Sequence, residues 1–150
     1  MAIQGGPWTF FNEYKRRVGL GEINKTADTM RMILLASTYA PNIGAHANLA
    51  DVSTHQIGGN GYPVNGVILA SKTWTRDDVA DSVIWGAATA SFGPASGGPI
   101  TARYALIYDD THASDALVAY CLLDEANADV SAPDGVSLEV ALPQGIAALS

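Results

Sequence analysis

The residues of this sequence that could perform nucleophilic chemistry are one cysteine and three histidines. A catalytic triad needs a serine, cysteine or threonine beside a histidine, with an acidic residue to orient that histidine. His46, His55 and His112 all fall in expected loops or at the margins of expected strands, and no nucleophile-elbow pattern is present. Cys121 lies in the apolar run 116–123, where a buried and inert thiol is expected. We therefore predict that the protein is not an enzyme.

Metal binding would need ligands at short, regular spacing, and the sequence offers only weak candidates. His46 and His55 are separated by a stretch without a regular helix, unlike the histidines of zinc sites. Two aspartate clusters lack the central glycine and final glutamate of the calcium-binding loop. They are Asp77, Asp78 and Asp81, and Asp109, Asp110 and Asp115. We expect solvated loop tips, with no metal and no cofactor; weak calcium binding and a glycosidase-type carboxylate pair are the open alternatives.

Residues 58–66, GGNGYPVNG, are rich in glycine, as are loops that bind phosphate. The stretch lacks the Lys-Ser or Lys-Thr ending of a phosphate loop, and no helical pattern follows it. It is therefore expected to be a turn.

Residues 8–18 are the one segment with helical periodicity. Phe10, Phe11, Tyr14 and Val18 recur at spacings of three and four residues and form one apolar stripe. A proline just before the segment suits the first turn of a helix, and glycines just after it suit the end. A helix this short is marginal alone, so the stripe either covers the domain's own core or docks on another subunit.

The rest of the chain is typical of short strands separated by turns. Residues 100–108 and 116–123 predict an antiparallel hairpin around a polar loop. Further strands are expected at residues 29–37, 52–57, 66–75, 82–92, 136–142 and 146–149. The pattern predicts an all-β, mainly antiparallel fold of the β-sandwich, jelly-roll or small-barrel type. It also suggests an N-terminal arm or helix over residues 1–25, followed by a single domain over 26–150.

The composition of the chain limits its partners. The 150 residues are 48% hydrophobic and only 15% charged, with a formal net charge of −7. An acidic chain repels phosphate backbones, so no binding to nucleic acid is expected. No signal-peptide pattern is found, and no apolar stretch approaches the ~20 residues of a membrane-spanning helix, so no membrane partner is expected.

The charge is unevenly distributed along the chain. Residues 1–31 carry five basic and three acidic residues, and the remainder carries three basic and twelve acidic ones. A mildly basic, aromatic segment on an acidic body can dock on a neighbour, although its aromatics could equally belong to the core. The candidate interface residues are Trp8, Phe10, Phe11, Tyr14, Lys15, Arg16 and Arg17.

Several stretches of the sequence together resemble a known group of proteins. They are FFNEYKRRVGLGEIN and TADTMRMILLASTYAPN within residues 10–42, the segment from His46 to Ser53 with GGNGYPVNGVIL at 58–69, and ITARYALIYDDT with LVAYCLLD within 100–124. In these stretches the chain resembles small virion proteins of tailed bacteriophages, and most closely capsid decoration, or cement, proteins. The resemblance covers almost the whole chain, and TARYALIYDDT is its most characteristic piece. It concerns fold and context and transfers no active-site residues.

The resemblance implies a structural protein that binds the outer surface of a capsid and bridges and stabilises neighbouring capsomers. Its partners would be the major capsid protein and further copies of itself, with a trimer favoured over a dimer. A symmetric oligomer can grip several subunits at once, so each copy needs only a modest interface. The protein would lie on the capsid surface of the virion, after synthesis in the cytoplasm of the host bacterium.

Two other functions are open at this point. The chain could be a head–tail or tail accessory protein of the virion, or a β-sandwich that binds host glycans. Trp74 and Trp85 would be sugar platforms if exposed, although tryptophans in strands are usually buried.

Overall fold

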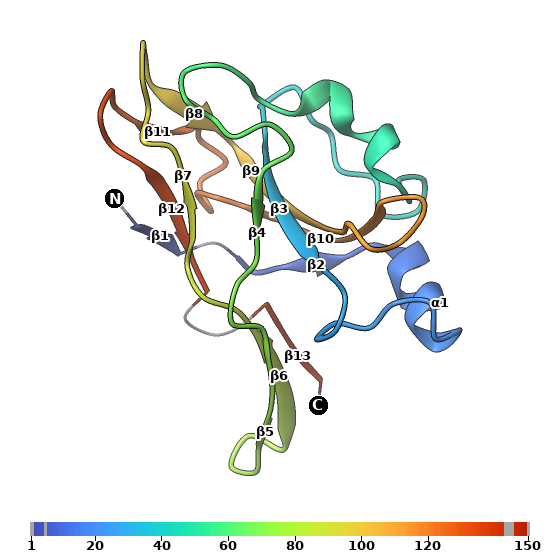
Figure 1. Ribbon diagram of the computed structural model, residues 1–150. Helices are drawn as coiled ribbons and strands as arrows, with labels where there is room; N and C mark the ends of the chain where they lie inside the picture. Colours follow the sequence, from blue (N-terminus) through green and yellow to red (C-terminus); the bar gives the residue numbers. More distant parts are fainter. Residues whose placement is uncertain (1, 5, 143–145, 150) are drawn as a thin grey trace.

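The computed structural model describes residues 2–4, 6–142 and 146–149 of the chain. Figure 1 shows short strands around a central sheet, with helix α1 (Asn12–Gly19) to one side. Two 3₁₀ helices are η1 (Leu49–Asp51) and η2 (Ser53–His55). The strands are β1 (Ala2–Gln4), β2 (Thr9–Phe10), β3 (Met30–Leu35), β4 (Val67–Ile68), β5 (Thr73–Asp77), β6 (Ser82–Gly86), β7 (Ala90–Phe92), β8 (Ile100–Ala102), β9 (Tyr104–Asp109), β10 (Ala116–Leu122), β11 (Val130–Ala132), β12 (Leu138–Ala141) and β13 (Ala147–Leu149). The predicted all-β, mainly antiparallel class is confirmed.

The central sheet has the strand order β2-β10-β9-β3-β4, and all of its pairings are antiparallel. β9 and β10 form the predicted hairpin, with Leu122 opposite Tyr104 and Ala116 opposite Asp109. β3, predicted within residues 29–37, pairs with the other side of β9 over its whole length. Apolar runs of strand length therefore specify the three innermost strands, because such runs are buried on both faces of a sheet.

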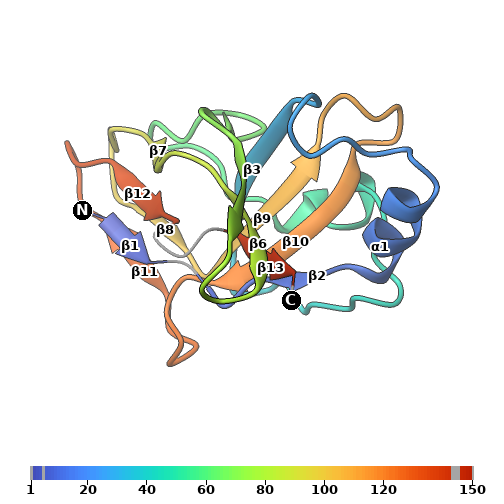
Figure 2. The ribbon, with the colours of Figure 1, turned by 90° about the horizontal axis from the view of Figure 1, so that it is seen from below.

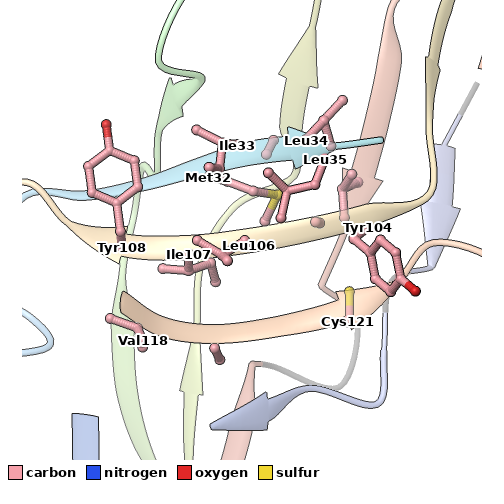
Figure 3. Packing of buried hydrophobic residues seen from close by; sticks show 14 of the residues in the cluster. Met32, Ile33, Leu34, Leu35, Tyr104, Leu106, Ile107, Tyr108, Val118 and Cys121 are labelled. Atoms are coloured by element: carbon pink, nitrogen blue, oxygen red, sulfur yellow. The ribbon is translucent and has the colours of Figure 1, made fainter. Parts of the chain in front are cut away.

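The core lies on both faces of this sheet. All six residues of β9 are buried, and so are five of the six residues of β3. Figure 3 shows their side chains on neighbouring strands, where Met32 stands opposite Ile107 and Ile33 opposite Leu106. Burial of this kind contributes about 25 cal/mol per Å² of apolar surface removed from water. The central sheet is therefore the main source of stability in the fold.

Three smaller sheets surround the central one. β12 pairs with β1 in parallel and with β7 antiparallel, β8 pairs with β11, and β6 pairs with β5 and β13. In β12 the predicted alternation is confirmed, because Leu138 and Val140 are buried while Glu139 is partly exposed. Figure 1 shows the β5–β6 hairpin projecting from the rest of the molecule. Figure 2 shows α1 and the β1–β12 pair at opposite ends.

Several element boundaries differ from the prediction. Residues 52–57 contain η2 and a single bridge at Gln56 in place of the expected strand. The expected strands 66–75 and 82–92 each divide into two, giving β4 with β5 and β6 with β7. The run 100–108 divides at Arg103, where the chain leaves the β8–β11 pair and enters the central sheet. Strands of two or three residues carry too little alternation to be found in a sequence, and β1 and β11 are absent from the prediction for this reason.

The N-terminal segment, predicted as a separable arm over residues 1–25, is part of the domain. β1 pairs with β12, and β2 pairs with β10 of the central sheet. Phe11 is fully buried, and its backbone N–H donates to Val118 O at 3.1 Å. Residues 1 and 5 of the predicted arm lie outside the described residues. Of the two alternatives for the aromatic stripe, the described residues show it packed against the chain's own core, with Phe11 and Tyr14 buried and Phe10 and Val18 partly buried.

Candidate functional site

Helix α1 positions the side chains that the sequence marks as an interface. It begins at Asn12, later than predicted, because the two residues of β2 pair with β10 instead of joining the helix. It ends at Gly19, as predicted. Gly21 follows in the left-handed region at φ +76°, and its N–H donates to Val18 O at 3.1 Å. A glycine in this conformation satisfies carbonyls at the helix end, so the two glycines do mark the stop.

Three of the seven predicted interface residues are buried within the chain. Phe11, Tyr14 and Arg17 are 0%, 4% and 8% exposed. The Arg17 guanidinium donates to Ala47 O at 3.0 Å and to Asn48 Oδ1 at 2.9 Å, which ties α1 to the loop before η1. A buried charge with such partners is costly to disrupt. Within the single chain, Phe11 and Arg17 thus contribute to the packing and anchoring of α1.

The other four predicted residues keep part of their surface. Trp8 and Phe10 are half-buried against the core, whereas Lys15 and Arg16 are exposed. Arg16 Nε donates to Glu13 Oε2 at 3.0 Å, and this hydrogen bond lowers the pKa of the Glu13 carboxyl. An ion pair at the surface adds little stability. In the described part of the chain, Phe10, Tyr14 and Lys15 of the predicted set line one hollow in the surface.

This hollow, which we name the α1 pocket, is formed by α1 together with the β5–β6 hairpin and has a volume of about 310 Å³. Phe10 and Tyr14 stack in its wall with ring centroids 4.9 Å apart and planes inclined by 14°. Trp74 and Trp85 are direct cross-strand partners in the hairpin. The lining residues are Phe10, Tyr14, Lys15, Val18, Lys25, Trp74 and Trp85. Four of the seven are aromatic, so the wall is mainly apolar.

Two ammonium groups belong to the lining of the α1 pocket. Lys25 Nζ lies 4.3 Å from the centroid of the Trp74 ring, which is a cation–π contact. Desolvation by partial burial lowers the pKa of Lys25. Lys15 projects from α1 and is exposed. A second hollow of about 350 Å³ shares Lys25 and Trp74 with the α1 pocket. The two lysines therefore favour an anionic group at this surface.

Two buried polar atoms of the pocket residues have no hydrogen-bond partner in the described part of the chain. They are the Tyr14 hydroxyl and Trp85 Nε1. Burial raises the pKa of the Tyr14 hydroxyl, so it stays protonated and able to donate. A buried donor without an acceptor costs about 1–3 kcal/mol. The aromatic wall and the two ammonium groups of the pocket suit an occupant that combines an apolar side chain with carboxylate oxygens.

The sequence identifies several of these residues singly, but not as a group. Trp74 and Trp85 are considered only as sugar platforms. Trp85 is fully buried and offers no platform, while Trp74 is 40% exposed with Lys25 over its ring. A hairpin turn centred on Val79 and Ala80 places the two tryptophans opposite each other. This register is the feature of the sequence from which their proximity could have been predicted.

The histidines and the cysteine do not form a catalytic cluster. His46 and His55 both contact the buried Tyr39 ring, at centroid distances of 5.6 and 5.7 Å. His112 lies in the loop between β9 and β10. Cys121 is 1% exposed, and desolvation by burial raises the pKa of its thiol to about 12. The thiol is therefore protonated at neutral pH, as expected for a core cysteine.

The two acidic clusters have structural roles in the described residues. Asp77 Oδ1 accepts the backbone N–H of Val79 at 3.0 Å and stabilises the turn of the β5–β6 hairpin. In the other cluster, Asp110 Oδ2 pairs with Arg31 Nε at 2.9 Å. Across the described ranges, no group of three or more His, Cys, Asp or Glu side chains is arranged to hold a metal ion.

One aspartate of the second cluster is fully buried. Asp109 Oδ1 accepts the backbone N–H of Thr111 at 2.9 Å and of His112 at 3.2 Å. Its Oδ2 has no donor among the described residues, and its carboxyl is adjacent to that of Asp28. Desolvation, and then the hydrogen bond and charge of Asp28, raise the pKa of Asp109 to about 7. The pKa of Asp28 is lowered, so the pair shares one proton that resides on Asp109.

Comparisons with models of protein families, with curated proteins and with solved structures find no match to this chain. None of the helices in the described ranges has the length and apolar character that a membrane crossing requires.

Proposed function

We propose that the chain is a non-enzymatic structural protein of a tailed-phage virion. It binds the outer surface of the capsid through the major capsid protein, and it bridges and stabilises neighbouring capsomers. The resemblance to capsid decoration proteins supports this assignment. The resembling stretches include β3, β9 and β10, so they coincide with the strands that build the central sheet.

The observation that carries the proposal is the exposure of large apolar side chains on two different elements. Val64 and Ile68, which are 83% and 57% exposed, lie on β4 and the loop before it. Trp74 and Val79, which are 40% and 98% exposed, belong to the β5–β6 hairpin. Apolar groups of this size gain free energy when a partner removes them from water. A protein that bridges two bodies needs two contact surfaces, and these two elements can supply them; Leu20, at the end of α1, is a further exposed apolar side chain among the described residues.

The energetics suit a protein that acts in many copies. A specific interface buries about 800 Å² on each partner, which a domain of this size can supply from one face. Because a capsid repeats the same binding position many times, small contributions from each copy add up over the shell. The low share of charged residues, 15%, favours contacts that are largely apolar.

Co-sedimentation with capsid shells tests the proposal. Shells are assembled from the major capsid protein encoded in the same genome and mixed with the purified chain. We expect saturable binding at a fixed ratio of chains to capsomers, and shells that withstand higher temperature when they are covered. Shells that sediment without the chain, or that gain no thermal stability from it, would overturn the proposal.

A paired set of variants locates the contact with the shell. Val64→Asp places a charge on the exposed loop before β4 and is expected to weaken shell binding by about tenfold. Thr89→Asp, at another exposed position, is the matched control and is expected to bind as the native chain does. Equal binding by both variants, or equal loss in both, contradicts the assignment of Val64 and Ile68 to the shell contact.

A further inference from the structure

The tip of the β5–β6 hairpin presents an apolar side chain among carboxylates. Val79 is 98% exposed there. The hydrogen bond from its backbone N–H to Asp77 Oδ1 fixes the turn. The guanidinium of Arg76 pairs with the Asp78 carboxylate, with Nε 2.7 Å from Oδ1, and so balances only one of the three carboxylates of Asp77, Asp78 and Asp81. The hairpin tip, residues 76–81, therefore carries two excess negative charges around one apolar group.

The α1 pocket has the complementary features. Its wall is aromatic, and the ammonium groups of Lys15 and Lys25 give it two positive charges. An apolar side chain flanked by carboxylates is the kind of group that this pocket would bind. The chain thus carries a pocket and, on another part of its surface, a segment that matches it.

The hairpin tip cannot enter the α1 pocket of its own molecule. Trp74 and Trp85, in the pocket lining, pair near the start of the hairpin, and the tip is at its far end (Figure 1). From Trp74 to Asp77 the strand rises by roughly 10 Å, at about 3.3 Å per residue. β5 and β6 are paired from Thr73 to Asp77, so the tip is held away from its own pocket. A second molecule must provide the occupant.

We propose that the hairpin tip of one copy of this chain binds in the α1 pocket of a second copy. Val79 packs against the aromatic wall, while the ammonium groups of Lys15 and Lys25 pair with the Asp81 carboxylate and compete with Arg76 for that of Asp78. The contact is head-to-tail, because each copy uses its tip on one side and its pocket on the other. Repetition of such a contact closes into a ring when the rotation between copies permits. It uses the hairpin, one of the two exposed apolar surfaces, and leaves Val64 and Ile68 for the capsid, so self-association is measured separately from the contact of Val64 and Ile68 with the shell.

Charge reversal on both partners tests the contact. The pocket variant is Lys15→Glu with Lys25→Glu, which reverses the sign of its charge. The tip variant is Asp78→Lys with Asp81→Asn; asparagine is chosen because Asp81 has φ +50°, where asparagine is tolerated. Light scattering after gel filtration should show a discrete ring for the native chain. It should show at least about tenfold weaker association for each variant.

The combined variant, with all four changes in one chain, separates this contact from a general loss of folding. Its tip is positive and its pocket negative, so association should recover to within about threefold of native. The far-ultraviolet circular dichroism and melting temperature of every variant serve as folding controls. A native chain that is monomeric, variants that associate normally, or folded combined variants that fail to recover would each overturn the proposal.

A cross-link supplies a direct readout of the contact. Chains carrying Val79→Cys are mixed with chains carrying Val18→Cys, because Val18 lines the pocket, and are then oxidised with a mild reagent such as diamide. We expect a covalent dimer from this mixture. Thr54→Cys, an exposed position on η2, replaces Val18→Cys in the control mixture and should give no dimer. Equal cross-linking in both mixtures, or capture of the major capsid protein by the Val79→Cys chain in place of a second copy, contradicts the proposal.

Discussion

The central sheet and the β5–β6 hairpin are both antiparallel, but their side chains have opposite environments. Every residue of β9 is buried, whereas four of the five residues of β5 are exposed. β9 lies between β3 and β10, and β5 lies at the edge of its sheet with β6 as its neighbour. The first region stabilises the chain because its side chains contact one another. The β5–β6 hairpin can be used for binding because the packing of the core does not depend on what the exposed residues of the hairpin contact.

This difference teaches where a binding surface can be built in a small domain. Truncation of a core side chain loses the free energy of its transfer out of water and the packing contacts around it. Substitution of an exposed side chain changes the free energy of unfolding very little. The α1 pocket lies between these extremes, since Trp85 belongs to the core and Trp74 to the surface. A partner can therefore contact the hairpin without any rearrangement of the central sheet.

Truncation of one side chain in each region should give the largest contrast. Leu106→Ala in β9 is expected to lower the free energy of unfolding by about 2–5 kcal/mol, because Leu106 is fully buried. Thr75→Ala in β5, where Thr75 is exposed, should change it by less than about 0.5 kcal/mol. Urea denaturation at neutral pH measures both values. A similar loss in the two variants would mean that the hairpin is as integral to the fold as the central sheet.

Two glycines with similar backbone angles extend the comparison to the loops. Gly66, at φ +75°, is pressed against the Met32 carbonyl of β3, and a Cβ there would lie 2.9 Å from Ile33 Cγ2. Gly97 has φ +82°, and a Cβ at that position would meet no other atom within 4 Å. We expect Gly66→Ala to cost about 2–3 kcal/mol of stability and Gly97→Ala about 1 kcal/mol, from its backbone angle alone. Equal melting temperatures of the two variants would exclude the close approach to β3.

The buried acid at the end of β9 gives the smallest effect and a pH signature. The pKa of Asp109 is raised to about 7 in the folded chain, so binding of a proton to Asp109 stabilises the folded state over the unfolded state. This stabilisation is fully present below about pH 4 and is lost as the pH rises from about 4 to 7. Asp109→Asn mimics the protonated acid, since its amide can donate to Asp28. It should therefore stabilise the chain by about 1–2 kcal/mol at pH 8 and by little at pH 4.

Urea denaturation of the Asp109→Asn variant and the native chain at the two pH values measures this effect. Asp110→Asn is the matched control, because Asp110 is exposed and paired with Arg31 at the surface. A variant that is less stable than the native chain at pH 8 would contradict the raised pKa of Asp109 in the folded chain.

The sequence predicts an element correctly where its side-chain pattern is compatible with only one structural environment. The apolar runs of β3, β9 and β10, the alternation of β12 and the glycine stop of α1 are all visible in it. The start of α1 is not, because helical periodicity extends through Phe10 while pairing with β10 takes that residue into β2. The burial of Phe11 and Arg17 is not visible either, since an aromatic and basic segment has the same pattern at a surface and against a core.

The sequence by itself determined the all-β class, the central hairpin and the buried cysteine, because these follow from local patterns of apolar and turn residues. Only the tertiary structure decided that the N-terminal segment joins the central sheet and that Lys25, Trp74 and Trp85 meet Phe10 and Tyr14 in one pocket. The physical reason is that these contacts join residues distant along the chain. Their pairing depends on strand order and register, which no single stretch of sequence encodes.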